Sequence, residues 1–353
     1  FHLCEIPLQK AEELLNAYLD AGGNYIETAP SYGNGESEIK IGLAISQRRS
    51  EYILVTKAHE RDYDSCKKTL EQSLVNLKTD YLDVVLLHAV DRSETLDQIL
   101  SENGAMKAIE EAKSAGKVHH IGISMHGQPD ILIEALQRYP FEAVMTTINY
   151  FDHCNFPTIQ KELLPLAMEK NCAVILMKAL GDGYLYRNVE KAFRYALSQP
   201  VAVLVAGINS TEMLTTDLEL IEENKPMSPE EIESWMKEAP ELGNYVCRQC
   251  AACTCPEGID IQKIFLLEAM FDRQMGDGNV SDPGIYALKE RLKHWFGTSK
   301  RSMEEYAQLD KTGKDCTSCG ACLPQCPYEI DIIAKLKNVD YKLDSAYGKI
   351  FGV

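Results

Sequence analysis

Short apolar runs alternate with amphipathic segments of helical period over residues 1–225 of the chain. A helix is expected first, over residues 8–21, because its apolar positions fall on one face. Seven strand-like runs follow, and most are unbroken stretches of Val, Ile and Leu, as is typical of parallel strands buried on both faces. The runs are residues 24–28, 52–57, 82–88, 119–124, 143–149, 173–178 and 203–207. Helical segments separate them, so the pattern predicts a repeated unit of strand and helix.

A leading helix followed by seven strands is one strand short of an eight-stranded barrel. The simplest completion is a (β/α)8 TIM barrel of the α/β class, whose first strand lies outside this sequence. The sequence begins with Phe1, so we expect an initiator Met and some upstream residues to be missing from it. An open, doubly wound sheet is the alternative, but the Gly-x-Gly-x-x-Gly pattern that usually opens such a sheet is absent from the sequence.

The pattern changes after residue 225. Ser228-Pro-Glu-Glu231 has the form of a capping box with Pro at the first helical position. Two later stretches, residues 259–270 and 285–296, also have helical patterns and lie between two groups of cysteines. We therefore expect a barrel over residues 1–225, a linker helix over 226–242, a mainly helical ferredoxin-like domain over 243–338 and a C-terminal tail over 339–353.

The chain carries a net charge of −17 at pH 7, and the acidity is concentrated in its first part. Residues 1–242 hold 38 acidic and 22 basic side chains, whereas the remainder is close to neutral. Such a surface repels nucleic acid and anionic lipid. The sequence also has no apolar run long enough to cross a membrane and no signal-peptide pattern at its start. We therefore expect a cytoplasmic protein with neither nucleic acid nor a membrane as a partner.

Ionisable side chains close three consecutive strands of the expected barrel. Glu27 follows the first run, Lys57 ends the second and His88 the third, while Tyr32 lies in the Gly-rich turn after Glu27. Parallel α/β folds place their chemistry at the carboxyl ends of the strands. A phenol, with an ordinary pKa of about 10, gives up its proton more readily beside a lysine ammonium, which a carboxylate can hold charged. Each of these residues alone is more often a surface or core residue, but together they predict a general-acid site suited to carbonyl reduction, with the histidine bound to a substrate oxygen.

A family resemblance rests on these same residues. Ile-Glu-Thr-Ala-Pro-Ser-Tyr-Gly at residues 26–33, followed by Val-Thr-Lys57 and Leu-Leu-His88, resembles the aldo/keto reductases. The resemblance runs from the first helix to about Asn224. It implies a (β/α)8 barrel, a nicotinamide cofactor and a small-molecule carbonyl or alcohol substrate. It also implies that the catalytic tetrad is Tyr32, Lys57, His88 and Glu27, with Glu27 in place of the family's usual Asp.

The resemblance also implies where a nicotinamide would bind. Ser124 stands where the family usually has Ser-Asn, although Met125 follows it here. The family holds the dinucleotide near a helix start after the last strand, which in this chain implies Gly207, Asn209 and Ser210. Backbone amides at such a helix start can hold a diphosphate, but the acidic residues nearby oppose a 2′-phosphate. NADP(H) is the family's usual cofactor, and NAD(H) or no nicotinamide is left open.

Eight of the twelve cysteines form two tight groups after residue 246. The first group is Cys247-x2-Cys250-x2-Cys253-x-Cys255-Pro, and the second is Cys316-x2-Cys319-x2-Cys322-x3-Cys326-Pro. The second spacing is that of ferredoxins, in which three thiolates bind one [4Fe-4S] cluster and the fourth binds another. Zinc usually takes cysteine pairs that lie farther apart, which argues against a zinc site. Zinc or free thiols are the alternatives to iron-sulfur clusters. The pattern predicts two [4Fe-4S] clusters in a protein of a reducing compartment.

Exchange of the fourth ligand between the two motifs gives each expected cluster its own set of thiolates. One set is Cys247, Cys250, Cys253 and Cys326, and the other is Cys316, Cys319, Cys322 and Cys255. Some aldo/keto reductases carry a C-terminal domain with two such clusters, and the whole chain resembles that subgroup. The remaining cysteines are expected to be buried apolar residues because they lack partners at ligand spacing. They are Cys4, Cys66, Cys154 and Cys172.

Two functions are compatible with these patterns. In the first, the barrel reduces a carbonyl or oxidises an alcohol, and the clusters exchange electrons with a redox partner such as a ferredoxin. Hydride transfer moves two electrons together and a [4Fe-4S] cluster moves one, so coupling them normally needs a flavin or radical step, and the sequence has no flavin signature. In the second, the protein is an electron-transfer or redox-sensing protein whose barrel has lost nicotinamide binding.

Overall fold

A computed structural model of the chain describes residues 2–239, 242–274 and 299–344. The chain divides into two compact units. Unit 1 comprises Phe1–Thr147, Lys161–Ala179 and Ala196–Pro226. Unit 2 comprises Ile148–Gln160, Leu180–Tyr195 and Met227–Val353. Two segments that follow strands in the chain therefore belong to unit 2, together with the cysteine-rich region.

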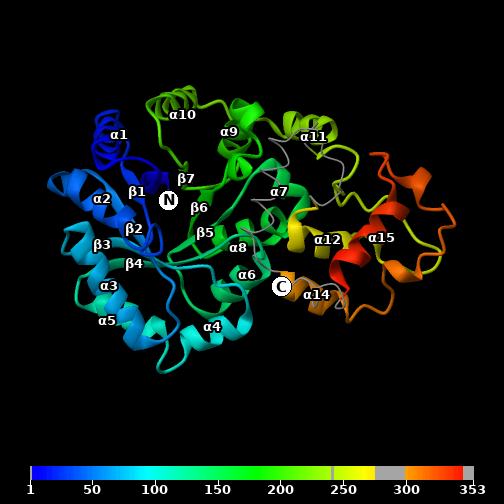
Figure 1. The fold of residues 1–353 in the computed structure, drawn as a ribbon, viewed down its shortest axis with the longest axis horizontal. Coiled ribbons are helices and arrows are strands. Elements are labelled where there is room, and N and C mark those ends of the chain that lie inside the picture. Colours follow the sequence, from blue (N-terminus) through cyan, green and yellow to red (C-terminus); the bar gives the residue numbers. More distant parts are fainter. Residues whose placement is uncertain (1, 240–241, 275–298, 345–353) are drawn as a thin grey trace. The chain divides into compact units, whose positions relative to one another are not determined.

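Unit 1 contains a parallel sheet of seven strands in chain order (Figure 1). The strands are β1 (Tyr25–Glu27), β2 (Ile53–Ala58), β3 (Leu82–Leu87), β4 (Val118–Met125), β5 (Ala143–Thr147), β6 (Ala173–Met177) and β7 (Val203–Val205). In the register, Lys57 of β2 lies opposite Leu86 of β3, and Ser124 of β4 lies opposite Met145 of β5. Each apolar run of the sequence is a strand whose ends lie within two residues of those expected.

Helix α1 precedes the first strand, and the other helices of unit 1 come after successive strands in chain order (Figure 1). These helices are α1 (Leu8–Asp20), α2 (Glu36–Ile45), α3 (Tyr63–Leu77), α4 (Ser93–Leu100), α5 (Ala105–Ser114), α6 (Pro129–Arg138), α8 (Leu164–Glu169) and α10 (Thr211–Glu223). Side-chain caps set the start of some of them: Asp62 accepts from the Ser65 amide before α3, and Ser210 accepts from the Met213 amide before α10. In the described part of the chain, no helix combines the length and apolar character that a membrane crossing requires.

The sheet curls around a buried apolar centre. The side chains that form this centre come from every second residue of a strand, because successive side chains of a strand point to opposite faces. They are Val55, Val84, Leu86, Ala143, Met145, Ile175 and Met177. Tyr25 of β1 and Val203 of β7 pack against this same cluster. Side chains from both edge strands thus meet at one centre, as a sheet curled into a nearly closed barrel requires, and the expected α/β barrel architecture is confirmed.

The N-terminal segment connects elements near both edges of this sheet. It forms the short helix η1 (His2–Glu5). Lys40, in the helix after β1, donates a hydrogen bond to the carbonyl of Leu3 at 2.9 Å. Asn209, in the loop after β7, donates to the Glu5 carboxylate at 2.8 Å. The segment therefore bridges from the helix after β1 to the loop after β7, the two edge strands of the described sheet.

The described part of unit 2 is mainly helical. Its helices are α7 (Tyr150–Asn155), α11 (Pro229–Glu238), α12 (Ile261–Asp272), α14 (Ser299–Tyr306) and α15 (Ile332–Leu343), and most of α9 (Val189–Leu197) lies in it. The capping box expected before α11 is present, with the Ser228 side chain and the Glu231 carboxylate each bonded to the other's amide. The helix expected over residues 285–296 lies outside the described residues. Helix α15 runs through residue 338, after which a tail was expected, to Leu343.

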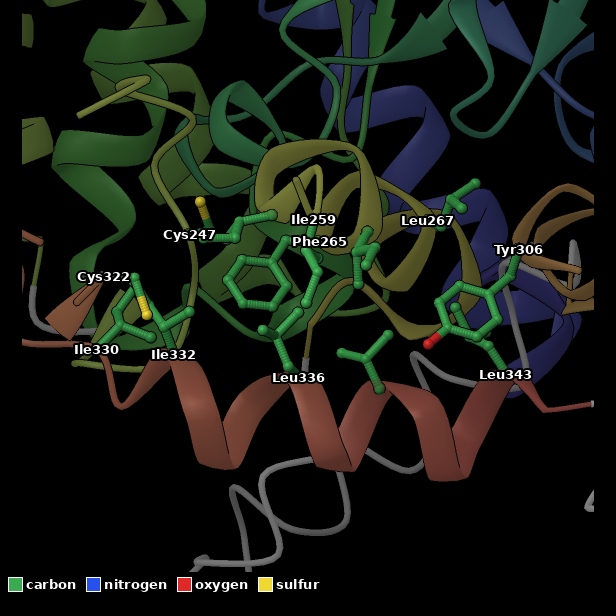
Figure 2. Packing of buried hydrophobic residues seen from close by; sticks show 13 residues of the cluster. Cys247, Ile259, Phe265, Leu267, Tyr306, Cys322, Ile330, Ile332, Leu336 and Leu343 are labelled. Carbon is green, nitrogen blue, oxygen red and sulfur yellow. The ribbon is translucent and has the colours of Figure 1, made fainter. Parts of the chain in front are cut away.

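The apolar core of unit 2 surrounds two of the cysteines (Figure 2). Helices α12 and α15 contribute most of it, with Tyr306 of α14 alongside. The buried members are Cys247, Ile259, Ile261, Ile264, Phe265, Leu267, Tyr306, Cys322, Ile330, Ile332, Leu336, Val339 and Leu343. Five further thiols or rings of the cysteine-rich loops pack against it while partly exposed, namely Cys253, Cys255, Cys316, Cys326 and Tyr328. Both cysteine motifs are therefore anchored on one core.

Candidate functional site

A tight turn after β1 places Tyr32 beside the end of β2. Gly33, Asn34 and Gly35 all have positive φ angles, of 60°, 54° and 92°. At Gly33 a Cβ would lie 2.8 Å from the Cys4 Sγ atom, so both the backbone conformation and the space favour glycine there. The turn then leads directly into α2. The Gly-rich punctuation of the sequence thus sets where the Tyr32 hydroxyl lies.

Lys57 is the centre of the polar contacts at this end of the barrel. Its ammonium donates to the Tyr32 hydroxyl at 3.2 Å and to the Thr28 carbonyl at 2.9 Å, and it forms an ion pair with Glu27. The Lys57 side chain is 2% exposed and that of Glu27 is 11% exposed. The three residues come from different positions along the sequence, and the parallel register of β1 and β2 brings them together. The structure therefore assembles Glu27, Lys57 and Tyr32 as the strand-end pattern predicted.

Burial controls the proton affinities of this group. It lowers the pKa of Lys57 well below the ordinary value, and the charge of Lys178 adds to that effect. Burial also raises the pKa of Tyr32 to about 12. The sequence led us to expect a tyrosine that releases its proton more readily than usual. In the structure the loss of water outweighs the neighbouring ammonium, so Tyr32 is a protonated phenol at neutral pH.

The imidazole ring of His88 lies next to the phenol ring of Tyr32. The two rings meet edge to face with centroids 6.1 Å apart. Burial, aided by the charges of Lys57, His59 and Arg61, lowers the pKa of His88 to about 3, so the imidazole is neutral. No hydrogen bond to its Nδ1 atom is found among the described residues. A neutral imidazole beside the phenol can bind an oxygen atom of a substrate without adding charge.

Arg61 fixes the backbone that carries His88. One terminal nitrogen of its guanidinium donates to the carbonyls of His88 at 2.8 Å and of Ala89 at 3.0 Å. Ala89 has a φ angle of 52°, which is uncommon for a residue with a Cβ atom, so this strand end is held in a bent form. Arg61 was not among the residues predicted for this site. Its place three residues after β2, close to the strand end, is the feature of the sequence that could have pointed to it.

The residues implied for a nicotinamide lie at two places in the barrel. Ser124 is buried, and its hydroxyl donates to the Leu87 carbonyl at 3.2 Å. Gly207 packs against the ring of His2, since a Cβ there would lie 2.2 Å from that ring. Asn209 is bonded to Glu5, and Ser210 caps α10. Three of the four residues therefore surround the start of α10, and the N-terminal segment contacts two of these.

A cavity in unit 2 brings together four cysteines from both motifs. Its lining includes Cys247, Cys250, Cys253 and Cys326, together with Phe265 and other residues. These are the four thiols that ligand exchange between the motifs assigns to one cluster. All twelve cysteines lie in the described part of the chain, and none of them forms a disulfide. Within the described residues, no three His, Cys, Asp or Glu side chains converge as ligands of a single metal ion.

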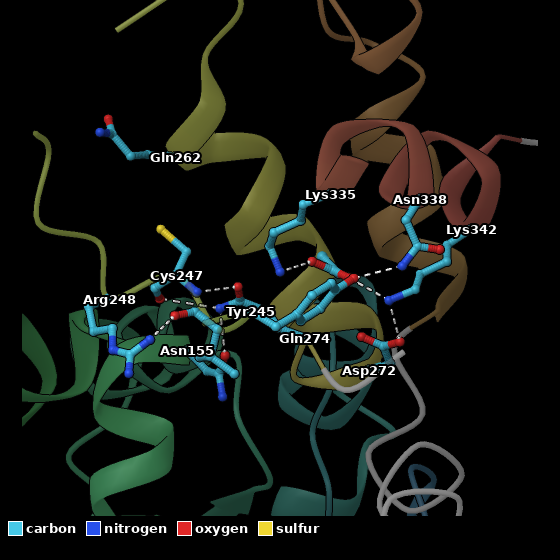
Figure 3. A network of polar contacts seen from close by, with 12 residues as sticks. Asn155, Tyr245, Cys247, Arg248, Gln262, Asp272, Gln274, Lys335, Asn338 and Lys342 are labelled. Atoms are coloured by element: carbon cyan, nitrogen blue, oxygen red, sulfur yellow. Dashed lines mark hydrogen bonds and ion pairs between the residues drawn. The ribbon is translucent and has the colours of Figure 1, made fainter. Parts of the chain in front are cut away.

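The backbone of Cys247 is held by the side chain of Gln274, which is in turn bonded to Asn155 (Figure 3). Gln274 accepts a hydrogen bond from the Cys247 amide at 2.8 Å and donates to the Asn155 side chain at 2.9 Å. The backbone amide nitrogen of Gln249 also lies 3.4 Å from the Cys247 Sγ atom. Burial raises the pKa of the Cys247 thiol to about 11. A chain that holds a thiol this firmly in an apolar place needs a positive group to favour the thiolate.

The second set of thiols is nearby in the same unit. Gln325, just before Cys326, accepts hydrogen bonds from the amide and hydroxyl of Thr254 at 3.0 and 3.1 Å. This contact joins the loop of the first motif, between Cys253 and Cys255, to that of the second.

The four cysteines outside the two motifs differ from these. Cys66, Cys154 and Cys172 are buried, as expected, and burial raises the pKa of each thiol to about 12. Cys4 was also expected to be buried but is partly exposed.

Comparison with known proteins adds to this geometry. Residues 4–233 match the model of the aldo/keto reductase family. The uncharacterized oxidoreductase YqkF of Bacillus subtilis is 30% identical over 188 residues, which are 50% of this chain and 58% of that protein. L-galactose dehydrogenase of Arabidopsis thaliana is 32% identical over 174 residues, which are 46% of this chain and 53% of that protein. The chain thus spans about half the length of these curated relatives.

A solved structure shows the same fold. It is an aldo-keto reductase from Klebsiella pneumoniae in complex with NADPH, with a TM-score of 0.56 and 22% identity. The likeness covers 66% of this chain and 85% of the Klebsiella protein. At this identity the likeness concerns the fold alone, and it agrees with the curled parallel sheet of unit 1.

Proposed function

Because the chain belongs to the aldo/keto reductase family, we propose that its barrel reduces a carbonyl group of a small molecule, or oxidises the corresponding alcohol. The observation that carries this proposal is the distance of 3.2 Å between the Tyr32 hydroxyl and the Lys57 ammonium, with Glu27 ion-paired to that lysine. A protonated phenol beside a buried cation is a general acid whose conjugate base is stabilised as it forms.

Each residue of the group has a distinct role in the proposed reaction. Tyr32 donates its hydroxyl proton to the carbonyl oxygen as that oxygen gains negative charge. Lys57 stabilises the phenolate that remains, and its ion pair with Glu27 favours the charged form of the lysine. His88, neutral and next to Tyr32, hydrogen-bonds the same substrate oxygen and orients it. In the oxidative direction the same proton returns to Tyr32.

We propose a nicotinamide, NADP(H) or NAD(H), as the hydride carrier. When bound, it supplies a hydride to the carbonyl carbon or takes one from the alcohol. Ser124, Gly207, Asn209 and Ser210 are the residues assigned to hold it. The amides at the start of α10 suit a diphosphate, because a helix N-terminus attracts anions. The NADPH complex of the Klebsiella protein supports this proposal through the shared fold.

We further propose two [4Fe-4S] clusters in unit 2. Cys247, Cys250, Cys253 and Cys326 would hold one, and Cys316, Cys319, Cys322 and Cys255 the other. The shared cavity of the first four thiols supports the first assignment. In a cubane each thiolate binds a different iron, so the sulfurs need not converge on one point as they do around zinc. The clusters would pass single electrons between the protein and a redox partner such as a ferredoxin.

An electron-transfer or redox-sensing protein without nicotinamide is the second candidate. One observation favours it: the loop after β7 already contacts the N-terminal segment, with Asn209 bonded to Glu5 and the ring of His2 against Gly207. In that case the general-acid chemistry of Tyr32 and Lys57 would be unused. Binding of nicotinamide separates the two candidates.

The deciding experiment uses the full chain purified without oxygen. Iron and acid-labile sulfide are measured first, and NADH, NADPH and reduced ferredoxin are then supplied with a panel of aldehydes and ketones. The reductase proposal expects turnover with a nicotinamide that stops in a Tyr32→Phe variant. Nicotinamide titration with no binding and no turnover would favour the second candidate. Zinc in place of iron would overturn the cluster assignment.

A further inference from the structure

Four charged side chains are buried together beside the cysteine-rich loops of unit 2. Glu268 and Asp272 come from α12, and Lys335 and Lys342 from α15. Lys335 Nζ lies 2.7 Å from Glu268 Oε2, and Lys342 Nζ lies 2.8 Å from Asp272 Oδ2 and also contacts Glu268. The side chains of Glu268 and Lys335 are 0% and 1% exposed. Apolar residues of similar size often stabilise a fold as well as such a cluster does, so its charges call for a role other than packing.

Lys335 is the member of the cluster that faces the cysteines. Its ammonium lies 3.6 Å from the centre of the Tyr245 ring and 4.8 Å from the centre of the Phe265 ring. Tyr245 precedes Cys247 by two residues, and Phe265 lines the cavity of the four thiols. The positive charge is therefore one aromatic ring away from the cavity.

The position of this charge is fixed from several directions. The Tyr245 hydroxyl donates to Glu268 at 2.7 Å and accepts from the Asn338 side chain at 2.7 Å, so the ring under Lys335 cannot turn freely. Burial alone would raise the pKa of Glu268, but Lys335 and Lys342 hold it well below its ordinary value. Glu268 is thus ionised, and its charge opposes the tendency of burial to neutralise Lys335.

Lys342 provides a natural comparison. It lies on the same helix, pairs with the same glutamate and is similarly buried, with a side-chain exposure of 10%. It is two helical turns farther along α15, and its ammonium is 5.8 Å from the Tyr245 ring centre. Its second partner, Asp272, lies at the far end of α12 from the residues that line the cavity. The two lysines therefore share a network but differ in their distance from the thiols.

We propose that the Lys335 ammonium raises the reduction potential of the [4Fe-4S] cluster held by Cys247, Cys250, Cys253 and Cys326, and so favours this cluster over the other as the electron acceptor. The inference rests on the proposed function, because it needs the cluster to be present. One electron from an external one-electron donor enters the cluster, and no bond forms or breaks. That electron adds negative charge, which a fixed cation stabilises strongly where water is excluded.

A comparison of two matched variants tests this role. Lys335→Met and Lys342→Met each remove one cation from the same network. The full chain is purified without oxygen, and both clusters are followed by electron paramagnetic resonance during a redox titration with dithionite. Lys335→Met is expected to shift the midpoint potential of one cluster to more negative values and to leave the other unchanged. Lys342→Met is expected to produce a clearly smaller shift.

Further variants keep the test decisive if Lys335→Met folds poorly. Lys335→Arg retains the charge and should leave both potentials near those of the wild type. Lys335→Met with Glu268→Gln removes both charges of the pair, so the shift should remain negative but be smaller than in the single variant. Equal shifts in Lys335→Met and Lys342→Met, an equal shift of both clusters or no shift would overturn the inference. A wild-type protein without iron and sulfide would instead overturn the proposed clusters themselves.

Discussion

The Arg273 guanidinium and the Asp152 carboxylate form a buried ion pair, with Nε 2.8 Å from Oδ1 and side-chain exposures of 3% and 2%. Arg273 ends α12 in a left-handed conformation, with a φ angle of 55°. Gln274, also left-handed, follows it and bonds to Asn155 and to the Cys247 amide. Two adjacent residues thus fasten the end of α12 to α7 and to the first cysteine loop, all within unit 2.

Breaking this ion pair should destabilise unit 2. Arg273→Met leaves the Asp152 carboxylate buried beside an apolar side chain, and loss of one partner of a buried pair costs about 3–5 kcal/mol. Amide hydrogen exchange in α7 and α12 measures the local free energy of opening. Lys237→Met is the matched control because Lys237 and its partner Glu233 are exposed, with side-chain exposures of 62% and 70%. That change should cost less than about 1 kcal/mol, and equal effects of the two variants would contradict the prediction.

Removal of one oxygen atom should abolish most of the proposed reductase activity. Tyr32→Phe keeps the ring beside His88 but removes the hydroxyl that lies 3.2 Å from Lys57. Because proton transfer from a placed acid contributes about 100-fold or more to the rate, kcat should fall by at least about that factor. Nicotinamide affinity should not change. Steady-state kinetics with an aldehyde substrate measures both quantities.

A surface tyrosine supplies the control for that measurement. The Tyr139 hydroxyl donates to Glu110 at 3.0 Å on an exposed part of the barrel. Tyr139→Phe therefore makes the same chemical change without touching the strand ends, and its kcat should equal that of the wild type. A Tyr32→Phe protein that retained the wild-type kcat would show that another group donates the proton.

The barrel and the assembly of its charged strand ends could be predicted because both depend on local pattern. Apolar runs marked the strands, and the parallel arrangement then brought the ends of β1 and β2 together, so Glu27 and Lys57 had to meet. The direction of the Tyr32 pKa could not be predicted in this way, since it depends on how much water burial removes. The charge of a neighbouring residue is visible in a sequence, but the loss of solvent around a hydroxyl is not.

The buried charges of unit 2 were missed for a related reason. The helical period places Lys335 and Lys342 beside the apolar stripe of α15, where a lysine normally extends its ammonium to solvent, and their partner Glu268 lies on another helix. Only tertiary packing shows that these side chains face one another. The assignment of residues 148–160 and 180–195 to unit 2 is likewise invisible in the repeat of strands and helices, because both segments occupy ordinary positions between strands.

Replacement of Cys326 should remove one cluster and spare the other. If ligands are exchanged between the motifs, Cys326→Ala damages the cluster of Cys247, Cys250 and Cys253, with which it shares a cavity. Iron per chain should then fall by about half, since one of two four-iron clusters is lost. Elemental analysis and electron paramagnetic resonance of the reduced protein measure the loss.

Two comparisons make the cysteine experiment specific. Cys250→Ala should abolish the same resonance signal as Cys326→Ala, whereas Cys319→Ala should abolish the other. Cys172→Ala, which removes a buried thiol of the barrel, should leave the iron content unchanged. Loss of the same signal in the Cys326→Ala and Cys319→Ala proteins would show that each motif binds its own cluster without exchange.

The neutral imidazole of His88 should make the stability of the barrel depend on pH. Its pKa is lowered to about 3 in the folded protein, mainly by burial, whereas an unfolded histidine titrates at about 6.5. Between these values the unfolded chain binds more protons than the folded one, so the free energy of unfolding rises with pH. The contribution is fully present above about pH 6.5 and is lost as the pH falls toward 3, by at most about 1.4 kcal/mol per pH unit.

Urea unfolding of the wild type and of His88→Gln at pH 7, 6 and 5 measures this contribution as the difference in the free energy of unfolding between the two proteins at each pH. That difference should shrink steadily as the pH falls, because the variant has no imidazole to protonate, and a difference that stays constant with pH would show that His88 is not held neutral by the fold.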